Sequence, residues 1–278
     1  MRSSKYTIIT TCKGRLDHLK VTLPAFLAFE DAEVIVVDYG CPQGTGDFVR
    51  QNYPSAKVVS VNDDSRFNIS RARNIGARSA TGDYLFFIDA DVVIRDSRLK
   101  ELLRTHERPN CFINFSNSIK AIDLLGTCLV PKQAFEKIGG YDEVITVYGG
   151  EERDLYARLR LNGIRPFLLD VGECLETIKH SHEERLIFRE GNTVRNSVII
   201  STCYRQAKIG LMRLLGKDLG HSERLALWNS VKSQLEEKLP SDAKRVDLVV
   251  EVPLETPYWP LKGIKYSRKL VVTVEKQL

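Results

Sequence analysis

Two aspartates follow the most apolar strand that the sequence predicts. That strand covers Tyr84–Ile88, and Asp89 and Asp91 come directly after it, separated by one alanine. Two carboxylates at a strand end can hold a hard divalent cation, because such ions prefer oxygen ligands and leave coordination sites for a phosphate. The same spacing also occurs in turns and helix caps, so the pair indicates a metal site only in combination with other residues.

A second acidic cluster lies in Gly149-Gly150-Glu151-Glu152-Arg153-Asp154. The two glycines let the backbone approach a ligand closely. A helix is predicted from Glu151 to about Leu161, and acids in its first turn also complement the positive end of the helix dipole. The dipole is sufficient to explain this cluster when it is taken alone.

A ligand of a different kind is offered by Lys179-His180-Ser181-His182. Imidazole is a good ligand for manganese and other transition metals and is less natural for magnesium. A single histidine in a loop is more often solvated or structural, so the residue types leave open whether His180, His182 or neither binds a metal.

Polar residues follow several predicted strands that alternate with helices. Strands are predicted at 6–10, 33–37, 56–61 and 84–88, and helices at 16–27 and 71–80. Strands that are apolar throughout and separated by helices indicate a parallel sheet covered on both faces. Ligands bind at the carboxyl ends of such strands, where we expect Thr11, Asp38 and Asp89 to converge.

The remaining elements are less regular. Ser70 is expected to cap the helix at 71–80, and Gly82 to end it. Further strands are predicted at 112–115, 126–130, 246–252 and 269–274, with a short helix from 131 and a helical stretch over 194–239.

Charge divides the chain near residue 183. Residues 184–278 hold 17 Lys and Arg against 11 Asp and Glu, a net of +6, whereas residues 1–183 carry a net of −1. We therefore expect one domain over 1–183 and a mainly helical extension of unknown role over 184–278. The basic residues form no tight cluster, which argues against a nucleic-acid partner.

The helical stretch of the extension is expected to pack an apolar face inward and to leave Lys208 and other basic residues in solvent. The apolar face is made of Val194, Val198, Ile199, Cys203, Ile209, Leu211, Leu214 and Leu215. Gln206 and Gly210 interrupt it, so at most a peripheral, salt-sensitive membrane contact is expected. With scattered cysteines, no visible export signal and no apolar run of roughly 20 residues, the sequence predicts a soluble cytoplasmic protein.

Taken together, the motifs resemble the GT-A glycosyltransferases of the family 2 type. The resemblance runs in family order over about residues 5–183, through Asn68–Ala77, Gly82–Asp91, Gly139–Glu143 and Tyr148–Asp154. The last two segments are similar to the carboxyl-terminal motif of β-1,4-galactosyltransferases and bacterial polysaccharide polymerases. The implied fold is α/β, a GT-A-like nucleotide-sugar-binding mixed, mostly parallel sheet flanked by helices. Its nucleotide-sugar part would cover about 1–95 and its acceptor part about 96–183.

The resemblance also implies roles for individual residues. Asp89 and Asp91 match the metal motif, with Asp91 favoured as the direct ligand, and His180 matches the histidine that completes a Mn²⁺ (or Mg²⁺) site. Glu152 stands in the place of the catalytic base, and Glu151 could hold the acceptor in line. The donor-side matches are Thr11, Cys12, Lys13 and Arg15 for the diphosphate, Asp38 for the uracil ring, Arg71 for the nucleotide and Tyr148 for a sugar.

The implied reaction moves a hexose or N-acetylhexosamine from a UDP-sugar to a saccharide or glycoconjugate hydroxyl, with inversion, as in polysaccharide or glycoconjugate synthesis. Galactosyltransferases carry Trp and Asp where Tyr148 and Glu152 stand, so the sugar is not fixed as galactose. A sugar nucleotidyltransferase is the alternative enzyme, but the loop at 10–15 has too little glycine for it. A non-catalytic sugar-binding module is the second alternative, against which the retained acidic residues argue.

Overall fold

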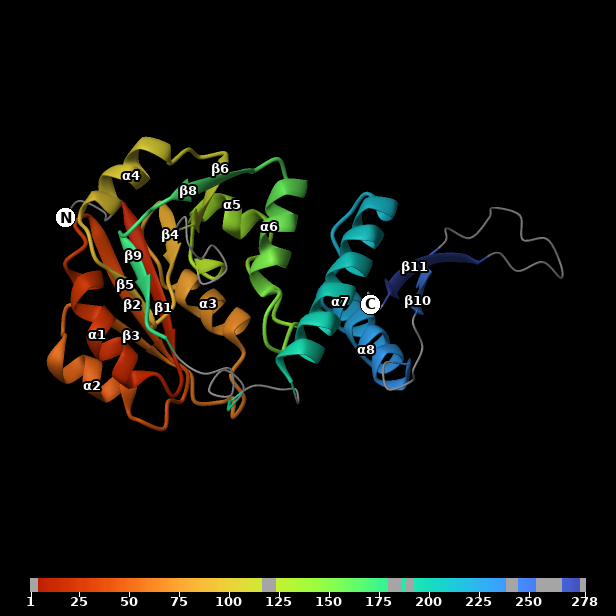
Figure 1. Ribbon diagram of the computed structural model, residues 1–278, viewed down its shortest axis with the longest axis horizontal. Coiled ribbons are helices and arrows are strands. Elements are labelled where there is room, and N and C mark those ends of the chain that lie inside the picture. Colours follow the sequence, from red (N-terminus) through yellow and green to blue (C-terminus); the bar gives the residue numbers. More distant parts are fainter. Residues whose placement is uncertain are drawn as a thin grey trace. The chain divides into compact units, whose positions relative to one another are not determined.

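The computed structural model describes residues 5–116, 124–179, 187–188, 193–238, 245–253 and 267–275. The chain forms two compact units, Met1–Glu190 and Gly191–Leu278 (Figure 1). The division falls seven residues beyond the position expected from charge. The reason lies at Phe188, whose carbonyl accepts a hydrogen bond from the Phe67 amide at 2.7 Å and so ties this segment to the first unit.

A seven-stranded sheet in the order β3-β2-β1-β4-β7-β6-β8 forms the centre of the first unit. β2 runs parallel to β1 and β3, β1 is parallel to β4, and β6 is parallel to β8, whereas β7 is antiparallel to both of its neighbours. The sheet is therefore mixed and mostly parallel, as predicted. Its strands are β1 (Tyr6–Cys12), β2 (Ala32–Asp38), β3 (Lys57–Ser60), β4 (Tyr84–Phe87), β6 (Cys111–Ser116), β7 (Cys128–Pro131) and β8 (Arg165–Asp170).

Helices cover both faces of this sheet (Figure 1). Neighbouring strand residues point to opposite faces, so Ile8 and Phe86 join a core with α1 and α4, while Ile9 and Phe87 join a core with α3, α5 and α6. The helices are α1 (Leu16–Leu27), α2 (Thr45–Asn52), α3 (Ile69–Arg78), α4 (Arg98–His106), α5 (Lys132–Lys137) and α6 (Glu151–Leu161).

The carboxyl ends of the parallel strands meet at one edge, as expected. Cys12 pairs with Asp38, Asp38 pairs with Ser60, and Ile9 pairs with Phe87 two residues before Asp89. Because β2 and β4 flank β1 and run in its direction, Asp38 and Asp89 lie at the same end of the sheet.

The predicted cap of α3 is wrong. The helix begins at Ile69, and the side chain of Asn68 caps it by accepting from the Arg71 amide at 3.0 Å, whereas Ser70 is fully buried. It ends at Arg78 rather than at Gly82. Gly82 instead lies against β1, where a Cβ would come within 2.7 Å of the Tyr6 backbone.

A small two-stranded sheet was not predicted from the sequence. β5 (Val92–Ile94) follows the two aspartates and pairs antiparallel with β9 (Leu175–Thr177). The pairing continues in a 2.7 Å hydrogen bond from the Ile178 amide to the Asp91 carbonyl. It brings the segment that leads to His180 beside Asp91.

The second unit consists of α7 (Val194–Leu215), α8 (His221–Lys238), and an antiparallel hairpin of β10 (Arg245–Val252) and β11 (Arg268–Glu275). The expected buried face of α7 is partly wrong, since Val198 and Leu214 are exposed. Lys208, expected in solvent, is fully buried with its ammonium 5.1 Å from the Tyr204 ring centre. Gly210 does not break the face, because it admits the Leu270 side chain of β11 at a distance that a Cβ would block. Among the described residues, no helix is long and apolar enough to span a membrane.

Candidate active site

The loop after β1 is largely buried. Thr11, Cys12 and Lys13 are inaccessible or nearly so, and half-buried Arg15 leads into α1. The Lys13 ammonium donates to the Asp64 carbonyl at 3.3 Å and lies 5.5 Å from the centre of the Tyr39 ring. This loop therefore places the Lys13 ammonium close to the carboxyl edge of the sheet.

Asp38, at the end of β2, already has backbone partners. Its Oδ1 accepts from the Cys41 amide and its Oδ2 from the Gly46 amide, both at 2.9 Å. A Cβ on Gly46 would come within 2.6 Å of Oδ2, so only glycine permits this contact. The carboxylate thus fixes the turn that leads into α2, and its predicted contact with uracil stays a prediction.

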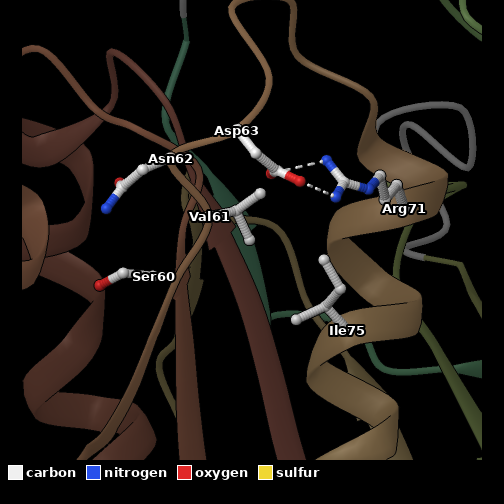
Figure 2. Close-up of a pocket in the computed structure, with 6 residues that line it drawn as sticks. All are labelled: Ser60, Val61, Asn62, Asp63, Arg71 and Ile75. Carbon is white, nitrogen blue, oxygen red and sulfur yellow. Dashed lines mark hydrogen bonds and ion pairs between the residues drawn. The ribbon is translucent and has the colours of Figure 1, made fainter.

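A pocket of about 500 Å³ opens beside this edge, between α3 and the loop that follows β3. It is lined by Ser60, Val61, Asn62, Asp63, Arg71 and Ile75. Figure 2 shows Arg71 on α3 reaching across to Asp63, with which it forms two hydrogen bonds of 3.1 and 2.7 Å. The predicted nucleotide-binding arginine, Arg71, therefore borders an open space beside the carboxyl end of β3.

Sequence reasoning missed the groups that hold Arg71. The Tyr39 hydroxyl accepts from Arg71 at 3.1 Å and donates to Asp64 at 2.6 Å. Burial first, and then the bond to Asp64, raises the pKa of Tyr39 far above its usual value, so the hydroxyl stays protonated. Tyr39 directly follows Asp38, and this position beyond a strand end was the one sequence signal that could have identified it.

Asp89 is paired with a buried cation on α3. Arg73 Nη2 donates to Asp89 Oδ1 at 2.8 Å and to the Gly126 carbonyl at 3.3 Å. The Arg73 side chain is only 3% exposed, whereas about a third of the Asp89 side chain is exposed. Sequence analysis assigned no role to Arg73, although it lies inside the run that carries the family resemblance.

The side chains at this edge supply part of the ligand set that a divalent cation needs. Asp89 and Asp91 supply carboxylates at one strand end, and β9 directs the following segment toward them. No group of three potential ligands occurs within the described ranges. His180 and His182, the predicted third ligands, lie outside the described residues.

Glu151 and Glu152 begin α6 and are both buried. The preceding Gly150 has φ of +99°, a conformation that glycine adopts readily, so the chain turns sharply and the helix starts at the acidic pair. Glu151 Oε1 lies 3.8 Å from Arg73 Nη1, which links this corner to Asp89. Tyr148, three residues before Glu151, is half-buried.

The environment of Glu152 favours its protonated form. Burial first, and then the charge of Glu151, raises the pKa of Glu152 to about 8. A carboxylate with such a pKa is a strong base once it is ionised, and this is the property that general-base catalysis near neutral pH requires.

The chain is similar to several known proteins. Residues 7–153 match the model of the family described as Glycosyl transferase family 2. Bovine β-1,4-galactosyltransferase 1 is 27% identical over 199 residues, which cover 65% of this chain and 43% of that protein. The chain thus spans less than half the length of this relative.

Two solved structures share the fold. Staphylococcus aureus TarS 1-349 in complex with UDP-GlcNAc has a TM-score of 0.58 at 14% identity, covering 82% of this chain and 72% of that one. A mannosyltransferase from Pyrobaculum calidifontis, in complex with GDP-Man and Mn²⁺, has a TM-score of 0.55 at 14% identity, covering 84% and 75%.

Proposed function

Because the chain belongs to glycosyltransferase family 2, we propose that it transfers a hexose or N-acetylhexosamine from a UDP-sugar to an acceptor hydroxyl with inversion. The acceptor would be a saccharide or glycoconjugate. One observation carries the proposal. Arg73 contacts both Asp89, at the carboxyl edge of the sheet, and Glu151, beside the buried carboxyl Glu152, so candidate donor and acceptor groups form one site.

The donor would bind along the edge from Asp38 to Asp89. Lys13 and Arg71 supply positive charge there, and Arg71 lines a pocket of about 500 Å³. Thr11, Cys12 and Arg15 would line the diphosphate, and Tyr148 would pack against the sugar. The Asp63 carboxylate holds Arg71 in this structure, and an anionic nucleotide would compete for the same guanidinium.

Asp91, with Asp89 and His180, would hold a divalent cation, Mn²⁺ or Mg²⁺. When bound, this ion supplies positive charge to neutralise the diphosphate leaving group. The oxygen donors of the two aspartates suit either ion, and a histidine favours manganese.

Glu152 would take the proton from the acceptor hydroxyl as that oxygen attacks the anomeric carbon. Its raised pKa makes the ionised carboxylate a strong acceptor for that proton. Glu151 would hold the acceptor in line, and such positioning contributes a large share of the rate enhancement. The attack comes from the face opposite to the leaving UDP, which gives inversion.

A screen of UDP-sugars tests the proposal. Purified protein is incubated with UDP-glucose, UDP-galactose, UDP-GlcNAc or UDP-GalNAc, with Mn²⁺, with Mg²⁺ or with a chelator, and UDP release is measured. We expect metal-dependent release from at least one donor, and more with an acceptor saccharide. Pyrophosphate-dependent formation of UTP would identify a sugar nucleotidyltransferase, and binding without release would identify a sugar-binding module.

The place of action is also part of the proposal. We expect the enzyme to work in the cytoplasm, with at most peripheral membrane contact through basic residues of the second unit. Co-sedimentation with anionic liposomes at low and high salt measures this contact, which should disappear at high salt.

A further inference from the structure

Arg73 is a buried cation between two parts of the chain that are distant in sequence. It lies on α3, and its guanidinium reaches Asp89 beyond β4 and Glu151 at the start of α6. Burying a charge is costly unless partners compensate it, so a fully buried arginine at this position needs a reason.

We propose that Arg73 is a positioning residue that fixes the donor-side carboxylate Asp89 relative to the acceptor-side carboxylate Glu151. This inference rests on the proposed function of the same site. Its two η nitrogens serve different partners: Nη2 donates to Asp89 Oδ1 at 2.8 Å, and Nη1 lies 3.8 Å from Glu151 Oε1. A planar guanidinium can hold two carboxylates in a set orientation, whereas an ammonium cannot.

The surroundings restrict Arg73 to this position. Its guanidinium carbon lies 5.1 Å from the centre of the Tyr141 ring, and Nη2 also donates to the Gly126 carbonyl. The neighbouring Asn74 bonds to the backbone of Tyr141 on both sides, as acceptor from the amide at 2.8 Å and donor to the carbonyl at 3.0 Å. These contacts anchor α3 to the segment before α6, so the arginine has little freedom to move.

Gly126 completes the arrangement. A Cβ at this position would come within 2.5 Å of Asp89 Oδ2 and 2.9 Å of Arg73 Nη2. Because a side chain would push the pair apart, the glycine is required for the contact between Arg73 and Asp89.

A second buried arginine shows what a purely structural pair looks like. Arg158 donates to Asp154 at 2.8 Å one turn away on α6 and to the Ile138 carbonyl at 2.8 Å. Its carboxylate partner belongs to its own helix. Arg73 instead joins carboxylates from two separate elements, Asp89 beyond β4 and Glu151 at the start of α6.

Three variants test the inference, with R78K as the matched control because Arg78 is exposed on the same helix. R73K keeps the charge but loses the planar fork, R73Q loses both, and G126A displaces the pair while Arg73 remains. Loss of a residue that orients a ligand typically costs about 10–100-fold. We expect kcat for sugar transfer to fall by that factor in all three variants and to stay within about twofold in R78K.

Calorimetry provides a readout other than activity. The affinity for Mn²⁺ in the presence of UDP is expected to fall about tenfold in R73K and G126A, because Asp89 loses its fixed orientation.

The pH profile of kcat provides a second readout. The groups that face Glu152 are Glu151, Arg73 and Tyr156, and Arg73 lowers the Glu152 pKa. Loss of the cation in R73Q should therefore shift the acid limb of kcat to higher pH, whereas R78K should leave it in place.

Urea unfolding of each variant separates positioning from folding. If R73Q does not fold, R73K and G126A decide the question. Folded R73K and G126A with wild-type kcat and wild-type Mn²⁺ affinity would overturn the inference, and so would a loss fully explained by a smaller folded fraction. Absence of transfer by the wild-type enzyme from every UDP-sugar would instead reject the proposed function.

Discussion

The carboxylates at the sheet edge and those at the start of α6 differ in how their charge is balanced. Asp38 accepts from two backbone amides, and Asp63 has its own guanidinium from Arg71. Glu151 and Glu152 are both buried at the start of α6, where Glu151 lies 3.8 Å from Arg73, a cation that is also bonded to Asp89. Asp38 and Asp63 therefore each have partners of their own, whereas the buried acidic pair at α6 depends on a cation that Asp89 also uses, and the pKa of Glu152 is raised.

The difference indicates how the site divides its work. Groups that bind a charged nucleotide can be held in place by ordinary partners and exchange them on binding. A base, in contrast, must have a high proton affinity, which burial and a like-charged neighbour provide for Glu152. Under the proposed function, this difference separates the groups that would bind the donor from the carboxylate that would take the proton.

The largest expected effect comes from removing a carboxylate of the metal motif at the sheet edge. Asp91→Ala should abolish metal-dependent transfer while the protein stays folded, because a hard cation loses ligand charge and geometry together. The measurement is UDP release during manganese titration of chelator-washed enzyme. Asp83→Asn, at the opposite end of β4 and exposed, is the control. Near-normal activity of Asp91→Ala would exclude this metal site.

The corner at α6 is tested by Glu152→Gln. Transfer should fall by about 100-fold or more, a typical general-base contribution, while UDP-sugar affinity changes little. Steady-state kinetics and calorimetry with UDP make the measurement. Arg153→Gln, exposed and next in sequence, should behave like wild type. A variant that lost donor binding but kept its turnover would place the base elsewhere, with Glu151 or Asp154 as the next candidates.

The pH dependence follows from the raised pKa of Glu152. The base must be ionised, so kcat should rise about tenfold per pH unit below about 8 and level off above it. A profile that is flat from pH 6 to 9 would contradict the assignment.

The same shift affects stability. The folded-state pKa of Glu152, about 8, lies above the ordinary value of 4.5, so the folded protein holds an extra proton between these limits. The stabilisation that this proton gives is therefore fully present below about pH 4.5 and is lost as pH rises toward 8. Urea unfolding of wild type and Glu152→Gln at pH 5, 6.5 and 8 measures this. The free energy of unfolding of wild type, relative to that of the variant, should fall as pH rises.

The smallest expected effect concerns the partner of Arg71. Asp63 is largely exposed, and solvent screens such a pair, so it contributes little to stability. Asp63→Asn should free the guanidinium for the nucleotide and tighten UDP binding by a few-fold, more at low salt than at high salt. Asp47→Asn, which removes a comparable exposed pair with Arg50, serves as the control in the same calorimetric titration. Weaker UDP binding in Asp63→Asn would show that Asp63 itself contacts the nucleotide.

Local pattern was enough to predict the first four sheet strands and α6. β2 and β4 carry near-continuous apolar residues, which indicate strands covered on both faces, and both cores confirm this. Short elements were harder to predict. β5 and β9 have three residues each and are defined mainly by their pairing across more than 80 positions, so no local pattern could predict them.

Side-chain partners were the least predictable feature of the site. Ser70 and Asn68 are both good capping residues, and only the position where the helix begins selects Asn68. Lys208 reads as a solvent-facing cation, yet it is buried over Tyr204, because burial depends on what packs against the helix. Sequence specifies which chemical groups are present, but not which of several suitable partners each one contacts.

The sequence by itself determined the family, the edge of the sheet at which the site forms, and the residue types that can do the chemistry. These properties follow from hydrophobic periodicity and motif order, which are local along the chain. Only the tertiary structure decided that Arg73 joins Asp89 to Glu151 and that Glu152 is buried beside a second carboxylate. Proton affinity and charge pairing depend on distance and burial, and Arg73, Asp89 and Glu151, which are 16 to 78 positions apart, come together only when the chain has folded.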